Sequence, residues 1–478
     1  MRESYRNERN CNVIRTTRCE ACDLLIYPFR RARHAPIDFT LKSTLHRIPP
    51  MPQTPSLSDS PNPRSKSSSF AKRFFKRILK TFALLALLGV LGLAALFALL
   101  WYEHNTRIEL PKPTGHFAVG RMTFSWVNNA LTDELAPSPN AKREVKVWMW
   151  YPSAAATSAP PAEYLPAPWR SALVQNSGAL MSQFLTRDLS LVQSHSTSDP
   201  DVSSEQLSYP VVILRAGGGA LTTDFTTLAE DLASHGYIVV GFDAPYRTFV
   251  FVRSDNSVVT RPPANDPEDM PAEQANRLIN KLLLLWTSDT SFVVNQLERL
   301  NAADPSGKFT GRLELQRLGM FGHSFGGATS LQFCHDDSRC KAGVDIDGAP
   351  YGSVVQDGLK QPFLFILSDH SRELSDPSSK QILANFQSIY DRLPSGRVFL
   401  TIRGANHFSF SDQMLQKSQF VIGLLRLLGF GRLEGRRGLA ITANYVHTFF
   451  DVHLKDAPAA SLDKLSQPYP EVQFGLPK

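Results

Sequence analysis

The stretch at residues 318–329 constrains the fold of this chain more than any other. An apolar run typical of a buried strand ends in Gly322-His323-Ser324-Phe325-Gly326, and small residues then lead into a segment that favours a helix. A strand, a tight turn and a helix in this order are the setting in which a Gly-x-Ser-x-Gly turn exposes its serine at the edge of a sheet. Such a turn strains the serine backbone and needs glycine two residues before and after it. Ser324 is therefore a candidate nucleophile.

Strands and helices alternate around this turn, which predicts an α/β fold with a mostly parallel central sheet and helices on both faces. Two antiparallel strands are expected first, at 117–126 and 144–151, and residues 152–208 form a long excursion that lines the site. The later strands are expected at 209–214, 237–242, 342–346, 362–367 and 397–402, and the helices at 224–235, 272–300 and 416–428.

The basic character of the chain belongs to its N-terminal tail. Residues 1–80 hold 17 Lys and Arg against 6 Asp and Glu, whereas the remainder holds 34 against 38. This balance gives no reason to expect a nucleic-acid partner for the globular part. The tail is rich in Arg, Ser and Pro, which predicts disorder, and Met51 suggests that residues 1–50 are a start-site artefact. Cys19-x-x-Cys22 is half of a zinc pattern with no second pair nearby, so neither metal nor cofactor is expected.

Residues 82–102 are almost wholly apolar and uncharged, long enough for one helix across a bilayer. Five basic residues precede the run (Lys72, Arg73, Lys76, Arg77 and Lys80), and Trp101-Tyr102 suit the interfacial aromatic belt. We therefore expect a transmembrane signal-anchor over residues 81–102, with the N-terminus in the cytosol and a catalytic domain, 103–478, on the extracytoplasmic side. A cleaved signal peptide is the alternative. In an oxidising compartment Cys334 and Cys340 could pair, or they could remain thiols.

A serine nucleophile needs a base to take its proton and an acid to orient that base. His407 follows the strand at 397–402 on a Gly/Asn loop at the carboxyl edge of the sheet, where ligands bind in open α/β sheets, and His370 is a weaker candidate. Two carboxylates end strands between the serine and His407, namely Asp347 and Asp369. The spacing alone leaves both open as the acid. Asp345, which alternates with Asp347, could make a structural hydrogen bond instead.

Two N–H groups must hold the oxyanion that forms when the serine attacks an ester. One should come from Phe325, directly after the serine, and the other from the loop that follows the strand at 209–214. That loop contains Gly217-Gly218-Gly219, whose bare backbone can approach a carbonyl closely. A phosphate-binding loop is not indicated, because no Gly-Lys-Ser/Thr follows.

Four segments together resemble the platelet-activating factor acetylhydrolases of the plasma and intracellular-II type, within the α/β-hydrolase superfamily. They are Tyr209-Pro210-Val211-Val212, residues 231–239, residues 322–329, and Thr401-Ile402-Arg403-Gly404-Ala405-Asn406-His407. The resemblance implies Ser324 as nucleophile, His407 as base, Asp347 as acid, and Gly218 as the second oxyanion donor. The chain departs from the family at Arg215-Ala216-Gly217, where the family has Ser-His-Gly, so the preferred acyl group does not carry over.

The resemblance also implies a substrate class, the short or oxidised sn-2 acyl esters of phospholipids, and no metal. We therefore expect a serine ester hydrolase that acts on a phospholipid or small ester and is held at a membrane by residues 81–102. Two alternatives are a generalist carboxylesterase for small soluble esters and an inactive hydrolase fold that serves as a binding protein.

Overall fold

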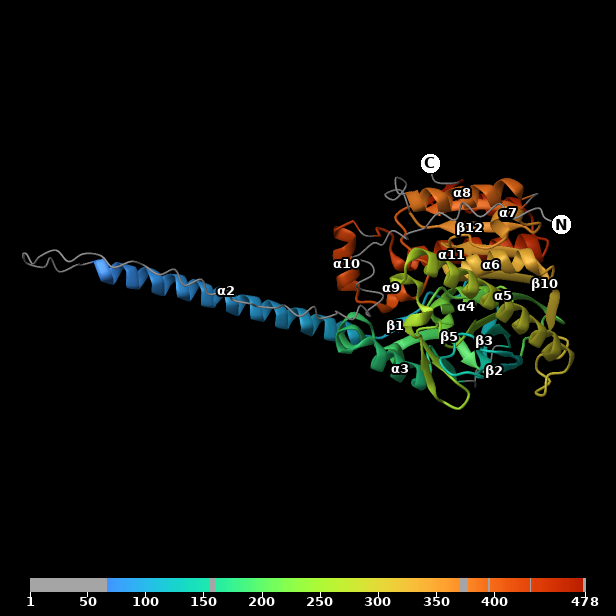
Figure 1. Ribbon diagram of the computed structural model, residues 1–478, viewed down its shortest axis with the longest axis horizontal. Helices are drawn as coiled ribbons and strands as arrows, with labels where there is room; N and C mark the ends of the chain where they lie inside the picture. The colour runs from blue at the N-terminus through green and yellow to red at the C-terminus, as the bar shows by residue number, and fades with distance from the viewer. Residues whose placement is uncertain (1–66, 155–159, 370–376, 394–395, 430, 476–478) are drawn as a thin grey trace, which may run out of the picture.

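A computed structural model describes the chain except for residues 1–66, 155–159, 370–376, 394–395, 430 and 476–478. A globular domain of stacked helices and strands lies at one end, and the long helix α2 projects from it (Figure 1). His370 lies outside the described residues, as do Cys11, Cys19, Cys22 and Met51.

A large sheet of twelve strands forms the centre of the globular domain. Along its main path the order is β1-β5-β2-β3-β7-β6-β10-β11-β12-β13-β14, and β4 pairs with β5 at one end. All pairs from β7 to β13 are parallel, whereas β2–β3, β3–β7 and β13–β14 are antiparallel. The predicted mostly parallel sheet is confirmed. The strands are β1 Ile108–Glu109, β2 Ala118–Thr132, β3 Lys142–Ser153, β4 Pro161–Glu163, β5 Val192–Ser198, β6 Tyr209–Arg215, β7 Ile238–Asp243, β10 Leu313–His323, β11 Cys340–Ile346, β12 Phe363–Leu367, β13 Arg397–Ile402 and β14 Val472–Phe474.

Helices cover both faces of this sheet because its strands are apolar on both sides. On β6, Val212 and Leu214 pack in one core with residues of α4 and α11, whereas Val211 and Ile213 pack in the other with residues of α5, α6 and α8. The main helices are α3 Ala167–Ser177, α4 Thr226–Ser234, α5 Ala272–Ala302, α6 Phe325–Asp336, α8 Pro377–Arg392, α10 Gln419–Leu427 and α11 Gly435–Leu454. Shorter elements are α7 Val354–Asp357, α9 Gln413–Gln416, α12 Ala460–Lys464 and a hairpin of β8 Val250–Val252 with β9 Val258–Thr260.

The excursion at 152–208 is more ordered than its Ala/Ser/Pro-rich composition suggests. It contains β4, α3, a π-helical turn at Met181–Leu185 and β5. Strand β5 pairs in parallel with β2 and β1, which extends the central sheet beyond the predicted strands. Its sequence, Val-Gln-Ser-His-Ser-Thr-Ser, is too polar to signal a buried strand.

The apolar segment near the N-terminus forms part of α2, Ser67–His104. The helix begins earlier than the predicted span, because the basic residues ahead of that span continue it. Within the described part of the chain, Lys72–His104 is the one helix long and apolar enough to cross a membrane, and only 6% of its most apolar window is buried. Its 38 residues span about 57 Å at about 1.5 Å per residue, more than a hydrocarbon core needs.

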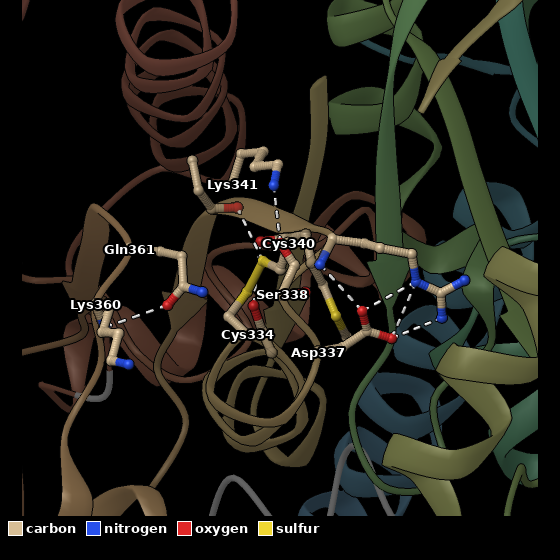
Figure 2. The surroundings of a disulfide bond; sticks show 11 residues. Cys334, Asp337, Ser338, Cys340, Lys341, Lys360 and Gln361 are labelled. Atoms are coloured by element: carbon tan, nitrogen blue, oxygen red, sulfur yellow. Dashed lines mark hydrogen bonds and ion pairs between the residues drawn. A yellow bond between two sulfur atoms is a disulfide. The ribbon is translucent and has the colours of Figure 1, made fainter. Parts of the chain in front are cut away.

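A disulfide joins Cys334 to Cys340, with Cα atoms 5.0 Å apart (Figure 2). Cys334 lies in the last turns of α6 and Cys340 begins β11, and both are fully buried. Asp337 sits in the short loop between them and binds the Arg339 guanidinium at 2.6 Å. The bond therefore ties the helix after the candidate nucleophile to the strand that leads to Asp347, and it resolves the alternatives left open for these two cysteines.

Candidate active site

Ser324 occupies the sharp turn between β10 and α6, with φ 56° and ψ −125°. A positive φ is rare for a residue with a side chain and signals local strain that the surroundings must hold in place. The backbone N–H of Ser324 donates to the Ile346 carbonyl at 2.9 Å, which fixes the turn against the end of β11. This is the geometry expected of a nucleophile turn.

The two flanking glycines are required by close backbone contacts. A Cβ atom at Gly322 would lie 2.0 Å from the Gly326 carbonyl oxygen, and a Cβ atom at Gly326 would lie 2.1 Å from the Arg215 carbonyl oxygen. Neither contact can be relieved by turning a side chain, because the neighbour is backbone. The Gly-x-Ser-x-Gly spacing is therefore a packing requirement of this turn.

Asp347 and His407 form a direct contact, as the resemblance implied. His407 Nδ1 lies 2.7 Å from Asp347 Oδ2, and the Asp347 side chain is buried whereas 38% of the His407 side chain is exposed. Asp347 follows β11 directly with φ 54°, and its backbone N–H donates to the Ile366 carbonyl at 2.7 Å. The imidazole can thus be held by one nitrogen while its other nitrogen remains available for proton transfer.

Ser368 orients the Asp347 carboxylate with two hydrogen bonds. Its backbone N–H donates to Oδ1 at 2.7 Å and its hydroxyl donates to Oδ2 at 2.9 Å. Sequence reasoning assigned no role to Ser368. The available signal was its place directly after β12, next to β11 in the sheet, since the carboxyl ends of neighbouring parallel strands meet at one edge.

Asp369 is not in contact with His407 through its carboxylate but supports the loop that carries the histidine. Asp369 Oδ2 accepts the backbone N–H of Gly404 at 2.8 Å, and its own N–H donates to the Ala405 carbonyl at 3.0 Å. These contacts brace the loop on both sides of its left-handed Gly404, at φ 75°. The contacts favour Asp347 over Asp369 as the partner of His407.

His323 links the serine turn to the histidine loop. Its Nε2 lies 2.7 Å from the His407 carbonyl oxygen, and the two imidazole rings are 4.4 Å apart. Burial, with a smaller contribution from His407, lowers the pKa of His323 to about 3, so the ring is neutral and Nε2 donates its proton to the carbonyl. The residue before Ser324 thereby fixes the backbone of His407. This role of His323 was not predicted from the sequence.

The glycine loop after β6 lies against the serine. A Cβ atom at Gly217 would lie 2.9 Å from Ser324 Cβ, and one at Gly218 would lie 2.5 Å from Nη2 of the buried Arg247. Phe325, the other expected oxyanion donor, begins α6 and packs edge-on against Trp286 with ring centres 4.9 Å apart. The two expected donor segments therefore flank the same serine.

Arg215 stands where the resembled family has serine, and the structure shows what its side chain contacts. The Arg215 guanidinium is fully enclosed, 3.9 Å from the centre of the Trp286 ring and 4.3 Å from that of Phe242, and it donates to the Phe242 carbonyl at 2.6 Å. Burial lowers the pKa of Arg215 to about 10, still well above neutrality. The residue fills space beneath the glycine loop and, through Trp286, supports Phe325.

Asp345 is the second carboxylate beneath the turn. Its side chain is fully buried, Oδ1 accepts the Gly348 N–H at 2.9 Å, and Oδ1 lies 1.8 Å from where a Cβ at Gly327 would stand. Burial raises the pKa of the Asp345 carboxyl well above its usual range, which favours the protonated acid. The structural hydrogen bond considered for Asp345 is present.

The remaining late histidines in the described chain make contacts outside this constellation. His447 Nδ1 pairs with Asp231 Oδ2 at 2.8 Å, and its ring stacks on His235 at 3.9 Å. His453 packs on the Phe449 ring, 4.6 Å between centres. His447 therefore binds a carboxylate on α4 and His453 packs against a ring of its own helix, and neither contact involves Asp347.

A sequence profile of the platelet-activating factor acetylhydrolase, isoform II, family matches residues 102–248 and 279–464. The chain belongs to this family. Membership makes it a carboxylic ester hydrolase of the α/β-hydrolase fold. The matched ranges include the glycine loop, the serine turn, Asp347 and His407.

Curated relatives carry related names at low sequence identity. A probable 1-alkyl-2-acetylglycerophosphocholine esterase of Arthroderma benhamiae is 26% identical over 287 residues, which covers 57% of this chain and 68% of the fungal one. A platelet-activating factor acetylhydrolase of Bos taurus is 26% identical over 268 residues, covering 52% and 57% respectively. A solved ferulic acid esterase from Streptomyces cinnamoneus superposes with a TM-score of 0.63 at 25% identity and covers 77% of this chain and 99% of its own.

Proposed function

We propose that this protein is a membrane-anchored serine ester hydrolase that removes short or oxidised sn-2 acyl groups from phospholipids. The contact that carries the proposal is the 2.7 Å pair between His407 and the buried Asp347, next to a serine in a strained turn. A buried carboxylate on Nδ1 keeps the imidazole proton at that nitrogen, so that Nε2 can accept the serine proton. The named substrates of the fungal and bovine relatives support the phospholipid class.

In the proposed reaction the Ser324 oxygen attacks the acyl carbonyl carbon while His407 Nε2 takes the serine proton. The N–H groups of Gly218 and Phe325 stabilise the oxyanion, and each donor of this kind contributes about 2.7–4 kcal/mol in enzymes studied by mutation. The protonated His407 then gives its proton to the leaving alcohol, and an acyl-serine remains. Water, activated by the same histidine, attacks the acyl carbon and releases the free acid.

The membrane assignment rests on helix α2 and on the Cys334–Cys340 disulfide. We propose that α2 spans the bilayer with the basic residues Lys72, Arg73 and Lys76 on the cytosolic side. The Cys334–Cys340 disulfide supports a catalytic domain on the extracytoplasmic side, because such bonds persist in oxidising compartments.

A second candidate function is a general carboxylesterase for small soluble esters. The likeness to a ferulic acid esterase over nearly all of that chain favours it, because the shared fold is not confined to phospholipid enzymes. Arg215, the last residue of β6 before the Gly217-Gly218 loop, also departs from the phospholipid family.

Two measurements test these proposals. A fluorophosphonate probe should label the wild type and Ser330→Ala, whose hydroxyl bonds to the Met320 carbonyl, but not Ser324→Ala. Labelling that persists in Ser324→Ala would refute the assigned nucleophile. Turnover of short-acyl phosphatidylcholine is then compared with p-nitrophenyl esters of equal acyl length. A kcat/KM at least tenfold higher for the phospholipid supports the first candidate, and the reverse supports the general esterase.

A further inference from the structure

Three side chains of the kinds that bind metal ions meet where α4 packs beside α11 (Figure 1). Asp231 lies on α4, His235 is the C-cap residue of that helix, and His447 lies on α11. Their ligand atoms, one carboxylate oxygen and two ring nitrogens, all lie within 4.8 Å of one another. Within the described residues no other group of His, Cys, Asp or Glu side chains converges in this way. The cluster lies outside the candidate active site.

The spacing along α4 brings two of these side chains together. Asp231 and His235 are four residues apart, so they lie on one face of the helix, and His235 Nε2 is 4.0 Å from Asp231 Oδ2. His447 reaches the same oxygen from α11, with its Nδ1 2.8 Å away. The two imidazole rings stack with centres 3.9 Å apart and 20° between their planes. Two imidazoles therefore share one carboxylate oxygen.

Thr114 holds that carboxylate from a third segment of the chain, between β1 and β2. Its backbone N–H and its hydroxyl both donate to Asp231 Oδ1, at 2.9 and 2.7 Å. The Thr114 hydroxyl oxygen also lies 2.9 Å from His235 Nε2. Thr114 thus binds Oδ1 and leaves Oδ2 facing the two histidines, which is how an outer partner orients a ligating carboxylate.

The distances fit a four-coordinate zinc ion. Zinc binds imidazole nitrogen and carboxylate oxygen at about 2.0–2.1 Å, which places neighbouring ligand atoms of a tetrahedral site about 3.3 Å apart. The separations of 2.8 and 4.0 Å between Asp231 Oδ2 and the two ring nitrogens lie on either side of this value. Small rotations of the imidazoles would therefore admit the ion.

Burial and charge in the cluster also suit this ion. The side chains of Asp231, His235 and His447 are 4%, 22% and 9% exposed, so the cluster is shielded from bulk water and reachable on the side of His235. Burial lowers the pKa of His235 to about 4, with a smaller contribution from His447, so this ring is neutral at pH 7. The nearby Lys455 ammonium is paired with the Asp451 carboxylate at 3.3 Å. Two imidazoles and one carboxylate favour zinc over magnesium or calcium, which prefer oxygen ligands.

We propose that Asp231 Oδ2, His235 Nε2 and His447 Nδ1 bind one Zn²⁺, with a water molecule as the fourth ligand. Each imidazole stays neutral when the ion binds, because the proton of its ligating nitrogen moves to its other ring nitrogen. Thr114 keeps its two hydrogen bonds to Oδ1 and so continues to orient the ligating carboxylate.

The position of the cluster makes this a stabilising ion. Helix α4 starts beside the active site, where the Phe225 ring lies 5.3 Å from the His323 ring. His235 follows at the other end of α4, about 15 Å further on at about 1.5 Å per residue. The ion would join α4, α11 and the segment that follows α2. Because it needs all three segments together, it would bind the folded chain and not the unfolded one.

Zinc titration of the full chain tests the site. The three cysteines of the N-terminal tail are replaced by serine, and the protein is purified in detergent through a tag without histidine and stripped with EDTA. The protein with no further change and its His195→Gln variant should each bind one Zn²⁺ per chain with the same Kd. His235→Gln and His447→Gln should bind at least tenfold more weakly. His195 is the matched control because 20% of its side chain is exposed. A lack of stoichiometric binding, or equal binding by all four proteins, overturns the proposal.

Further measurements do not depend on the folding of those two variants. X-ray absorption of the Zn²⁺-loaded protein should show nitrogen and oxygen ligands at about 2.0–2.1 Å with the outer scattering of two imidazoles, and a shell of oxygen alone overturns the proposal. At a hundredfold excess of Zn²⁺ over its Kd, Tm should rise by about 3 °C and EDTA should reverse the rise, whereas an unchanged Tm overturns the stabilising role. EDTA should leave p-nitrophenyl acetate turnover within twofold, and a loss of turnover by folded protein would overturn that role as well.

Discussion

Replacing Asp347 by asparagine separates its charge from its shape. In the wild type, Oδ2 accepts from His407 Nδ1 and from the Ser368 hydroxyl, and Oδ1 accepts the Ser368 N–H at 2.7 Å. If the new amide places its oxygen at the Oδ1 position, its NH2 faces His407. The imidazole must then carry its proton on Nε2, where it cannot accept the proton of the serine.

In the other orientation the amide oxygen faces His407, so the imidazole keeps its proton on Nδ1, but this orientation has a cost of its own. Its NH2 would face the Ser368 N–H, and a buried donor without an acceptor costs about 1–3 kcal/mol. Loss of the negative charge next to the imidazolium removes a further about 1.5–3 kcal/mol. Together these give about 2.5–6 kcal/mol, so Asp347→Asn should lower kcat by about two to four orders of magnitude.

The assay is kcat on p-nitrophenyl acetate, with Asp369→Asn as the matched control. Asp369 acts as an acceptor for the Gly404 N–H, and the amide oxygen of asparagine can keep that bond, so kcat should stay within tenfold of the wild type. A folded Asp347→Asn protein with kcat within tenfold of the wild type would refute the assignment of the acid. A larger loss in Asp369→Asn would refute it equally.

Three other changes test parts of the fold. Arg143→Ala removes a buried guanidinium that binds Asp289 at 2.6 Å and Asp133 at 2.8 Å, and it should cost about 3–5 kcal/mol in denaturant unfolding, whereas the exposed Arg277→Ala should cost less than about 0.5 kcal/mol. Cys334→Ser combined with Cys340→Ser should lower the free energy of unfolding by about 2 kcal/mol, as expected for so short a loop, and an unchanged value under oxidising conditions would contradict this. Because the pKa of His323 is lowered to about 3 from 6.5, the unfolded chain protonates this ring first as the pH falls. Stability should therefore drop by about 1.4 kcal/mol per pH unit below pH 6.5, and a pH slope that is no shallower in His323→Gln would exclude this ring as the cause.

Much of the fold could be predicted because the central strands are apolar on both faces. Strand β6, predicted to end at 214, runs over Tyr209–Arg215, and β13 over Arg397–Ile402 has the predicted bounds. Strand β5 could not be predicted, since its polar residues pair with β2 at one end of the sheet, where burial is partial. The first turns of α2 were missed as well, because the basic residues before the apolar run were not expected to be helical, although charged side chains do not prevent helix formation in solvent.

The candidate site could likewise be predicted only in part. The serine turn is visible in the sequence because backbone contacts force both glycines. The acid was ambiguous because Asp347 and Asp369 both end neighbouring strands, and only the backbone direction distinguishes them. Asp347, at φ 54°, reaches His407, whereas Asp369 binds the Gly404 N–H. The contact of His323 with the His407 carbonyl depends on two loops meeting in space, which spacing along the chain does not report.

The strained turn at Ser324 lowers the stability of the fold for the sake of the proposed function. A residue with a side chain at φ 56° and ψ −125° costs of order 1–3 kcal/mol, and glycine would adopt the same backbone with little penalty. Ser324→Gly should accordingly raise the melting temperature while abolishing the proposed chemistry. Engineering this enzyme for heat tolerance by selecting on melting temperature alone would therefore favour loss of its proposed nucleophile, so any such selection needs turnover as a second criterion.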